Sequence, residues 1–420
     1  MDSQHDVAII GGGVIGVCSA YYLAQKGLRV LLIEKGEIAS GCSYGNGGLI
    51  VPSHVAPLAS PGALGNGLRW LLDSESPFYI KPRLDLELFS WLIRFALASR
   101  HEQVRRALPA MRDLLLASRA LYDELSQNEK FDFGFEGNGS LQVFLTETGW
   151  KGGVEEAHLL EKFDIPIQVM SAAEVCNLEP ALLPNVTGGI YYPRDAHIDP
   201  FRFVTGLAEK VRELGVEILT GTEVLAFETR HERVVAIKTT RGDVHPQKVV
   251  LAAGSWSPAV GRALRLNIPI QAAKGYSITF QKPAVSPKIP LLFGEAHVVV
   301  NPLRDALRVA GTLELAGMDF SINMRRVTAI RKAAEQYLPG LDQARVIEIW
   351  RGLRPCTPDG LPIISRSDSL DNLFIAAGHA MLGMSLGPIT GKLVSQLVNE
   401  ERPDFNLALF NLDRFYRLSH

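Results

Sequence analysis

The chain has 420 residues, long enough for two or three domain-sized units that each bury a core. Its 43 Lys and Arg residues nearly balance 45 Asp and Glu residues, so the formal net charge is −2 and the composition excludes nucleic-acid binding driven by overall positive charge. The four cysteines are scattered, with no CxxC pair and no Cys/His cluster at ligand spacing, which predicts neither a disulfide framework nor a metal site.

The first 25 residues predict a strand, a glycine-rich turn and a helix. Val7–Ile10 is rich in β-branched residues, and Val14–Gln25 has the length and apolar spacing of a helix. Gly11, Gly13 and Gly16 lie where the strand turns into the helix. Gly11 permits a tight turn, Gly13 lets the backbone approach a diphosphate, and Gly16 lets the helix pack closely on the strand. Because a helix N-terminus favours an anion, this turn predicts a dinucleotide site.

An acidic residue further on supports that interpretation. Gly27 is expected to end the helix, residues 28–33 are expected to form the second strand, and Glu34 follows directly. Its distance from Gly11, 34 − 11 = 23 positions, is close to the roughly 20 expected for an acid that accepts hydrogen bonds from a ribose. An acid there also disfavours a 2′-phosphate. The alternative, a glycine-rich turn in another α/β unit, is the weaker interpretation because strand, helix, cap and acid all agree.

A long segment at 36–67 is rich in Gly, Ser and Pro and cannot form one regular element. Gly45, Gly47 and Gly48 flank Asn46 and are followed by three apolar residues. This pattern is typical of backbone laid against a flat ligand, so we expect an ordered binding loop rather than a linker.

The pattern becomes helical from 84 to about 127. Within it, residues 86–97 carry several large apolar side chains, and we favour a helix packed inside the protein over one that docks on a membrane surface. No run approaches the roughly 20 apolar residues of a membrane span, and no signal peptide is recognised, so the expected location is cytoplasmic.

Strands and helices alternate through the rest of the chain. Residues 216–251 predict a small antiparallel insertion that leads back to a buried strand, VVLAAG. The other expected elements are helices at 201–214, 325–337 and 390–399 and strands at 276–280, 297–300, 307–311 and 373–377. A nucleotide unit at the N-terminus, a buried strand in mid-chain and a glycine-rich strand-to-helix unit near the C-terminus predict one α/β nucleotide-binding domain assembled from separated segments.

Four motifs give the chain a family resemblance. They are NGGLIVPSHVAPLASPG with its continuation GLRWLLDSESPFYIKPRLD, then VVLAAGSWSP, WRGLRPCTPDGLPII and AAGHAMLGMSLGPITG, in that order. The chain resembles the FAD-dependent amino-acid dehydrogenases and oxidases, the D-amino-acid dehydrogenases most closely, with glycine oxidase, sarcosine oxidase and D-amino-acid oxidase as relatives. The resemblance covers nearly the whole chain. The expected fold is a Rossmann-type FAD-binding domain at 1–80, 187–260 and 352–420, with an α+β substrate domain of mainly antiparallel sheet at 81–186 and 261–351.

The resemblance implies noncovalent FAD, held by residues from several parts of the chain. They are Gly11, Gly13, Val14, Ile15, Gly16, Glu34 and Lys35 for the ADP half; Ser43, Asn46, Gly47, Gly48 and Leu49 for the middle and the isoalloxazine; Val224 for the adenine; Ala253, Gly254 and Trp256 from the second FAD-contacting strand; and Gly378, His379, Gly383, Met384 and Ser385 over the flavin ring.

The resemblance also implies a substrate site. Arg354 in GLRP looks like the family's carboxylate-binding position, and the planar fork of an arginine suits a carboxylate. Tyr276 in KGYS is expected either to donate to that carboxylate or to be a buried core tyrosine. His54 and His297 are weaker pocket candidates, with surface or packing roles as the alternative. Arg351 is expected to form a structural ion pair.

Met381 stands where glycine oxidase carries a second carboxylate-binding arginine, which favours a larger, apolar substrate group. The leading hypothesis is therefore a D-amino-acid dehydrogenase that acts on a D-amino acid, with a cyclic D-proline derivative as one candidate, and passes electrons to a quinone or another carrier. The alternatives are an oxygen-using oxidase of the glycine or sarcosine kind and a non-catalytic FAD-binding subunit. Contact with nucleic acid is not expected, whereas peripheral contact with a membrane stays open.

Overall fold

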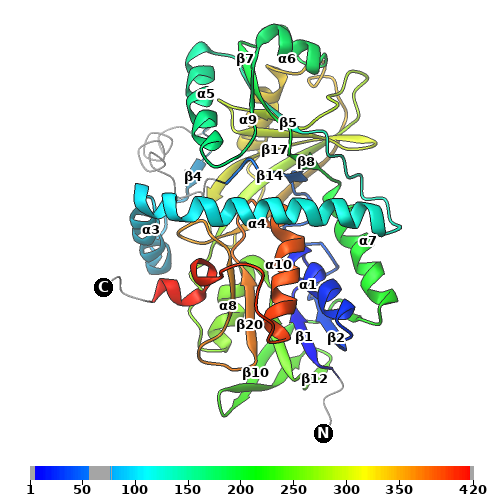
Figure 1. Cartoon of the computed structure of the whole chain (residues 1–420), viewed down its shortest axis with the longest axis vertical. Coiled ribbons are helices and arrows are strands. Elements are labelled where there is room, and N and C mark those ends of the chain that lie inside the picture. The colour runs from blue at the N-terminus through cyan, green and yellow to red at the C-terminus, as the bar shows by residue number, and fades with distance from the viewer. Residues whose placement is uncertain (1–4, 56–75, 77, 417–420) are drawn as a thin grey trace.

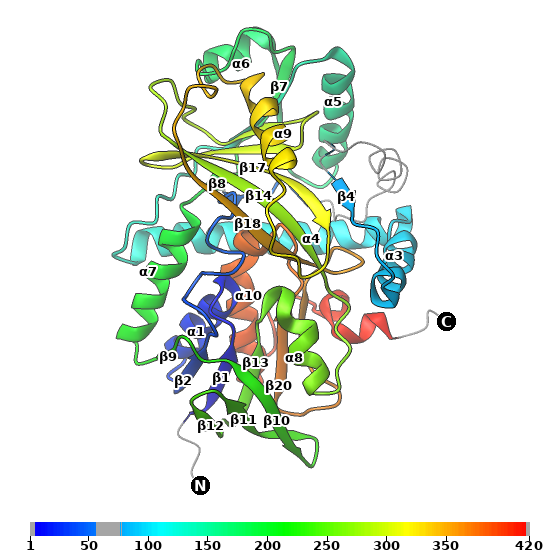
Figure 2. The same ribbon diagram turned by 180° about the vertical axis from the view of Figure 1, so that it is seen from behind.

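The computed structural model describes residues 5–55, 76 and 78–416 (Figure 1). A nine-stranded sheet lies at one end of the molecule and a six-stranded sheet at the other, and the long helix α4 (His101–Asn128) crosses the molecule between them in both views (Figures 1 and 2). The predicted binding loop after Val55, and much of the motif that follows it, lies outside the described residues.

The six-stranded sheet is the predicted nucleotide-binding sheet. Its strand order is β19-β20-β13-β1-β2-β9, and all neighbours are parallel except β19 and β20. Strands β1, β2 and β20 are buried at every residue, which explains why the sequence shows unbroken apolar runs there. The bounds are β1 Val7–Ile10, β2 Val30–Ile33, β9 Glu217–Leu219, β13 Lys248–Leu251, β19 Ile363–Arg366 and β20 Leu373–Ala377. The Rossmann-type prediction is confirmed.

The nine-stranded sheet is mainly antiparallel, as predicted. Its order is β18-β14-β17-β16-β15-β5-β7-β6, with β4 paired to β17. Only the pairs β15 with β5 and β17 with β4 are parallel. The bounds are β4 Phe78–Ile80, β5 Ser140–Phe144, β6 Gln168–Ser171, β7 Gly188–Tyr192, β14 Gln271–Gln281, β15 Leu291–Phe293, β16 Val298–Pro302, β17 Ala306–Leu315 and β18 Val346–Cys356.

Two smaller sheets and the helices complete the described fold. The predicted antiparallel insertion is β10 (Val224–Arg230), β11 (Arg233–Thr239) and β12 (Gly242–Val244), and a two-stranded pair joins β3 (Leu49–Ile50) to β8 (Ala196–His197). The remaining elements are α1 Val14–Gln25, α3 Leu86–Ala98, α5 Glu147–Glu161, α6 Ala172–Leu178, α7 Pro200–Glu213, α8 Ser257–Ala263, α9 Met324–Glu335, α10 Gly383–Val398 and the short 3₁₀ turns η1 Gly254–Trp256, η2 Ala408–Phe410 and η3 Leu412–Phe415.

Three elements contact a different domain from the one to which the expected boundaries assign them. Strands β4 and β7 fall inside the segments assigned to the FAD-binding domain, yet both pair in the nine-stranded sheet. Helix α4 was assigned to the substrate domain, but it contacts α10, and its buried residues share one apolar core with α1. An apolar face shows that an element is buried but not which element covers it, so the sequence pattern alone could not assign these elements.

Helix α3 has two apolar faces. Leu88, Trp91 and Phe95 are buried against β4 and β17, as the packed interpretation predicts, whereas Phe89 and Ile93 are 63% and 48% exposed. Over the residues that the structure describes, no helix combines the length and the hydropathy needed to span a bilayer.

Helix α10 begins at Gly383, seven residues before the predicted start at 390, although Pro388 lies inside it. A proline has no backbone N–H, so the carbonyl of Met384 loses its usual intrahelical donor. The buried hydroxyl of Tyr122 on α4 donates to that carbonyl instead, at 2.7 Å. The helix therefore continues through the proline because another helix supplies the missing hydrogen bond.

We expect Tyr122→Phe to lower the free energy of unfolding by about 1–3 kcal/mol, because the Met384 carbonyl would stay buried without a donor. Urea unfolding of the two proteins measures the difference. Ser126→Ala on the same helix is a matched control, since its hydroxyl bonds only within α4. An equal loss in both variants would contradict the role of Tyr122.

Candidate cofactor and substrate site

A cavity of about 450 Å³ lies at the carboxyl edge of the parallel sheet. Ile10 at the end of β1, Ile33 at the end of β2, Ala252 after β13 and Ala377 at the end of β20 all line it. Ligands of open α/β sheets bind at this edge, because the strand-to-helix loops and the helix N-termini gather there. The cavity is therefore where the sequence places a dinucleotide.

Most of the predicted cofactor residues line this cavity. They are Gly11, Gly13, Val14, Ile15, Glu34, Lys35, Ser43, Asn46, Val224, Ala253, Gly254, Trp256, Gly378, His379, Gly383 and Met384. The structure thus brings together segments that lie up to 373 positions apart, since 384 − 11 = 373. Gly16, Gly47, Gly48, Leu49 and Ser385 do not line it.

The glycine-rich turn is close-packed at two of its three glycines. A Cβ on Gly16 would lie 1.9 Å from the carbonyl oxygen of Gly11, and one on Gly11, whose φ is +117°, would lie 2.4 Å from that of Ala252. A Cβ on Gly13 would meet only the Ser43 hydroxyl, at 3.4 Å. Gly16 therefore lets α1 pack on the turn, while Gly13 leaves the cavity side open, as the sequence predicts.

Gly48, Leu49 and Ser385 do not line the cavity but hold the backbone of the binding loop in place. Gly48 has a φ of +75°, and a Cβ there would lie 2.3 Å from the side-chain nitrogen of Asn301. The Ser385 hydroxyl donates to the Leu49 carbonyl at 2.9 Å and accepts from the Val51 amide at 3.2 Å. These contacts fix the loop backbone around residues 48–51 against β16 and α10.

Arg308 on β17 is a loop-holding residue that the sequence analysis missed. It is 6% exposed, and its Nη1 donates to the carbonyls of Tyr44 and Asn46 at 3.2 and 3.1 Å. Its Nε donates to Thr279. An arginine inside an otherwise apolar strand is a signal that could have marked it, because buried guanidinium groups need acceptors.

Glu34 takes part in the turn as well as in the cavity wall. Its carboxylate accepts from the Gly12 amide at 2.7 Å and from the Gly36 amide at 2.8 Å. The acid is therefore oriented by backbone at the place where a ribose is expected. Lys35 follows it and lies over the Trp256 ring, 4.6 Å from the centroid.

The start of α10 and His379 form the far end of the cavity. Gly383 and Met384, the first two residues of α10, line it, and no side chain caps this helix end. Free amides and the positive dipole end therefore face the cavity, where they favour negative charge. Burial lowers the pKa of His379 to about 3, and its Nε2 lies 3.0 Å from the Thr390 hydroxyl. His379 is a neutral hydrogen-bonding residue of the cavity wall.

Arg354 lies on β18 between Leu353 and Pro355, which line the cavity, but Arg354 itself does not line it. Its guanidinium covers Gly275, where a Cβ would lie 2.0 Å from Nη1. Nη1 donates to the Thr312 carbonyl at 2.7 Å, in a bulged part of β17 where Thr312 has a φ of +65°. Burial lowers the pKa of Arg354, and no carboxylate of the described residues pairs with it. The remaining donors are available for an anion.

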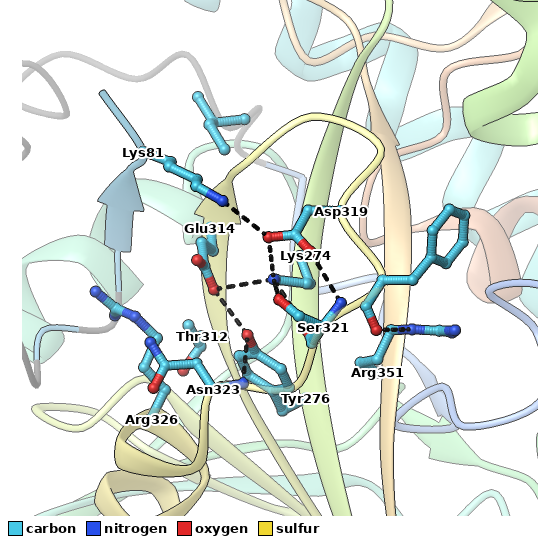
Figure 3. A network of polar contacts seen from close by, with 12 residues as sticks. Lys81, Lys274, Tyr276, Thr312, Glu314, Asp319, Ser321, Asn323, Arg326 and Arg351 are labelled. Atoms are coloured by element: carbon cyan, nitrogen blue, oxygen red, sulfur yellow. Dashed lines mark hydrogen bonds and ion pairs between the residues drawn. The ribbon is translucent and has the colours of Figure 1, made fainter. Parts of the chain in front are cut away.

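Tyr276 does not line the cavity. Its ring is 1% exposed, its hydroxyl donates to the Glu314 carboxylate at 2.8 Å, and that hydroxyl also accepts from the Asn323 amide at 3.3 Å (Figure 3). Burial and the contact with Glu314 raise the pKa of Tyr276. The hydroxyl of Tyr276 already donates its hydrogen bond to Glu314. The buried-core interpretation of Tyr276 therefore fits the structure, and the carboxylate-donor interpretation does not.

The two candidate histidines also lie outside the cavity wall. His297 occupies the exposed turn between β15 and β16, with a φ of +50°. His54 follows β3, and its Nδ1 lies 3.0 Å from the hydroxyl of Ser53. The structure therefore does not bring His54, His297 and Tyr276 together around one ligand.

Ser53 connects this loop to a buried acid. The hydroxyls of Ser53 and Ser140 both donate to Asp195 at 2.6 Å, and Asp195 is 1% exposed. Burial raises the pKa of Asp195 to about 6, and the serine hydrogen bonds oppose that rise. This carboxyl joins the segment after β3 to strand β5.

We expect Asp195 to make stability depend on pH between about 4 and 6. Because the native carboxyl binds a proton more tightly than the unfolded one, the contribution of Asp195 to the free energy of unfolding should rise by about 2–3 kcal/mol as the pH falls through this window, and should be constant above it. Urea unfolding at several pH values measures this slope. Asp195→Asn should remove that contribution, and equal slopes in both proteins would contradict it.

One prediction about the cavity wall needs correction, and three lining residues were not predicted. Arg351 forms no ion pair with a described carboxylate; its Nε donates to the Phe320 carbonyl at 3.0 Å, and both residues line the cavity. Phe320, Cys42 and Thr222 line it too and were missed. Cys42 and Thr222 lie next to or near the predicted Ser43 and Val224, whereas nothing in its local sequence marks Phe320, which only long-range folding brings to the cavity.

Comparison with known proteins decides the family. Residues 6–397 match the model of the FAD dependent oxidoreductases. The chain belongs to this family. It is 31% identical over 417 residues to a D-amino acid dehydrogenase of Allorhizobium ampelinum, covering 97% of this chain and 98% of that one. A D-amino acid dehydrogenase of Helicobacter pylori is 27% identical, with 99% and 100% covered.

Solved structures agree with this assignment. The glycine oxidase of Geobacillus kaustophilus superposes with a TM-score of 0.80 at 25% identity and covers 98% of this chain and 99% of its own. An L-proline dehydrogenase of P. horikoshii has a TM-score of 0.78 at 21% identity, covering 99% of both chains, which shows the fold.

The cofactor of this FAD dependent oxidoreductase is FAD, and the residues present fit it. The tight glycine turn and the helix N-terminus of α1 suit a diphosphate, Glu34 suits a ribose, and the N-terminus of α10 suits the negative charge of a reduced flavin. The cavity runs between these groups. Residues at both ends would hold the two halves of FAD.

Proposed function

We propose that the protein is a D-amino-acid dehydrogenase that uses FAD to oxidise the α-carbon of a D-amino acid and passes the electrons to a quinone or another carrier. The observation that carries the proposal is Arg354, a guanidinium that no described carboxylate neutralises, on the strand segment whose neighbouring residues Leu353 and Pro355 line the cavity. The similarity over nearly full length to proteins named D-amino acid dehydrogenase supports the same reaction.

In this proposal Arg354 binds the substrate carboxylate. Charge-assisted pairs between arginine and carboxylate form two parallel hydrogen bonds, which fix orientation as well as position. The Thr312 carbonyl and the flat space over Gly275 hold the guanidinium, so little freedom is lost when substrate binds. Leu353 and Pro355, on either side of Arg354 in β18, line the cavity.

When bound, FAD supplies the acceptor for the hydride from the α-carbon. The protein's own task is then placement and electrostatics. The α10 N-terminus would favour the negative charge that develops on the cofactor, and neutral His379 would add no charge of its own. Met381 lies just before α10 and is 48% exposed. Because Met381 is apolar, the proposal keeps the apolar substrate group that the sequence favours.

The experiment is anaerobic flavin bleaching with a panel of D-, L- and N-alkyl amino acids that includes D-proline derivatives. Bleaching by D-amino acids alone is the expected result, and bleaching only by L-amino acids would overturn the proposal. A preparation that holds FAD but bleaches with none of them would instead indicate a non-catalytic FAD-binding subunit.

The electron acceptor is tested separately, because the structural similarity to a glycine oxidase favours oxygen as the second candidate. The same substrate is given with air or with a quinone dye, and peroxide and dye reduction are both measured. Dye reduction with little peroxide is expected. Stoichiometric peroxide would replace the dehydrogenase with an oxidase. We also propose that FAD is noncovalent, so that acid precipitation should leave all of it in solution.

A further inference from the structure

Four side chains form a continuous stack along the cavity wall. Lys35 Nζ lies 4.6 Å from the centre of the Trp256 ring, and Trp256 stacks on Phe320 with centroids 6.3 Å apart and planes at 29°. The guanidinium carbon of Arg351 lies 4.8 Å from the centre of the Phe320 ring. All four residues line the FAD cavity. Lys35 and Trp256 follow strands of the six-stranded sheet, whereas Phe320 and Arg351 belong to the other sheet and its loop.

Burial does not account for the position of Phe320, because this residue is 46% exposed. The loop that carries Phe320 is nevertheless held at three successive residues, through the side chain of Asp319 and the carbonyls of Phe320 and Ser321. The Phe320 carbonyl accepts from Arg351 Nε at 3.0 Å, and Lys274 Nζ contacts the Asp319 carboxylate at 3.2 Å and the Ser321 carbonyl at 3.1 Å (Figure 3). Lys274 is 1% exposed.

The anchor extends beyond Lys274. Lys81, next to β4, also pairs with Asp319 at 3.3 Å, and Glu314 lies 3.8 Å from Lys274 (Figure 3). The hydrogen bonds from Ser321 and the two lysines hold the pKa of Asp319 well below its usual range. A loop with this many charged contacts holds an exposed phenyl ring against the cavity, which suggests a role for the ring there.

The two ends of the stack are cations without acidic partners. No described carboxylate forms an ion pair with Lys35 or Arg351, although each lines a cavity that receives a diphosphate. Cations so placed favour an anion between or beside them. The stack is therefore apolar in its middle and positive at both ends.

We propose that Lys35, Trp256, Phe320 and Arg351 form a clasp that closes the FAD cavity between the two sheets and slows the release of FAD. Ring–ring and cation–ring contacts of exposed side chains are weak individually, so the clasp can open by movement of the 316–323 loop without unfolding of either sheet. The positive ends attract the cofactor's diphosphate. The proposal rests on FAD binding and is independent of the role of Arg354 and of the substrate.

The test measures release of FAD from the holoenzyme, by dilution and recovery of free-flavin fluorescence. Phe320→Leu should speed release roughly 5- to 50-fold, the change expected for losing one ring–ring and one cation–ring contact. Phe320→Tyr keeps the ring and should stay within about twofold of the wild type. An unchanged rate in Phe320→Leu, or equal acceleration in both variants, would overturn the proposal.

Two more variants separate the clasp from a general effect of the loop. Met318→Ala changes another exposed apolar residue of the same loop, 44% exposed, that does not line the cavity; it should leave the release rate unchanged. Equal acceleration in Met318→Ala would overturn the proposal. Asp319→Ala removes the anchor and should speed release as Phe320→Leu does, and a wild-type rate there would overturn the anchoring step.

Charge at the end of the clasp gives an independent readout. Arg351→Gln should raise the Kd for FAD and make it less sensitive to added salt, because one cation of the wall of the FAD cavity is gone. The melting temperature of the apoprotein should not change in Phe320→Leu, since the ring is half exposed. A large fall in that temperature would indicate a packing role and contradict the clasp.

Discussion

Arg354→Met is expected to raise the KM for the amino acid by roughly 30-fold to several thousand-fold while leaving the FAD content unchanged. Removing one partner of a buried, hydrogen-bonded charge pair costs about 2–5 kcal/mol, because the other charge is left unpaired. Arg354 has no described acidic partner of its own, so the fold loses only the bond to the Thr312 carbonyl. Steady-state kinetics with a dye acceptor measures KM and kcat, and the flavin spectrum gives the FAD content.

Gly275→Ala provides a matched test of the same role. The new Cβ would lie 2.0 Å from Nη1 of Arg354, and the flexible guanidinium end would have to move. We expect a smaller rise in KM than in Arg354→Met and no loss of FAD. Arg354→Lys keeps the charge but lacks the planar fork, so it should fall between wild type and Arg354→Met. An unchanged KM in Arg354→Met would reject the carboxylate-binding role.

Gly16→Ala is expected to impair folding itself, whereas Gly13→Ala should impair only the binding of FAD. A Cβ on Gly16 would lie 1.9 Å from the Gly11 carbonyl, and neither backbone can move without separating α1 from β1. Overpacking of this kind typically costs about 1–3 kcal/mol and more when backbone is the obstacle. A Cβ on Gly13 has 3.4 Å of space to Ser43 but enters the cavity.

The measurement compares the melting temperatures of the two apoproteins and then their FAD affinities. Gly16→Ala should melt several degrees below wild type without FAD, or fail to accumulate as soluble protein. Gly13→Ala should melt like wild type without FAD and bind FAD more weakly. The reverse pattern, or equal melting temperatures in both variants, would contradict this division of roles within one turn.

Local pattern was enough to predict the nucleotide half of the site. The turn at Gly11–Gly16 and the acid at Glu34 lie within one strand-helix-strand unit. The geometry of that unit is regular, so the number of residues between the turn and the acid determines where the two lie relative to each other. The Rossmann-type sheet was predictable because its buried parallel strands leave continuous apolar runs, whereas the mainly antiparallel second sheet was expected from the family resemblance.

The substrate side could not be read in this way. The sequence left Tyr276 open as either a pocket residue or a core tyrosine. Its hydroxyl donates to Glu314 on the neighbouring strand, and only the pairing of β14 with β17 shows that contact. Helix α10 looked shorter than it is, because Tyr122 on a distant helix replaces the hydrogen bond that Pro388 removes. In both cases a long-range contact decides the outcome.

The sequence by itself determined the kind of cofactor site and the arginine expected to meet the substrate. Only the tertiary structure decided that Arg354 is held by Gly275 and Thr312, that Arg308 fixes the binding loop, and that Phe320 and Arg351 reach the FAD cavity. The physical reason is that short-range periodicity reports burial and turns, whereas the identity of a contacting partner depends on how strands far apart in the chain pair.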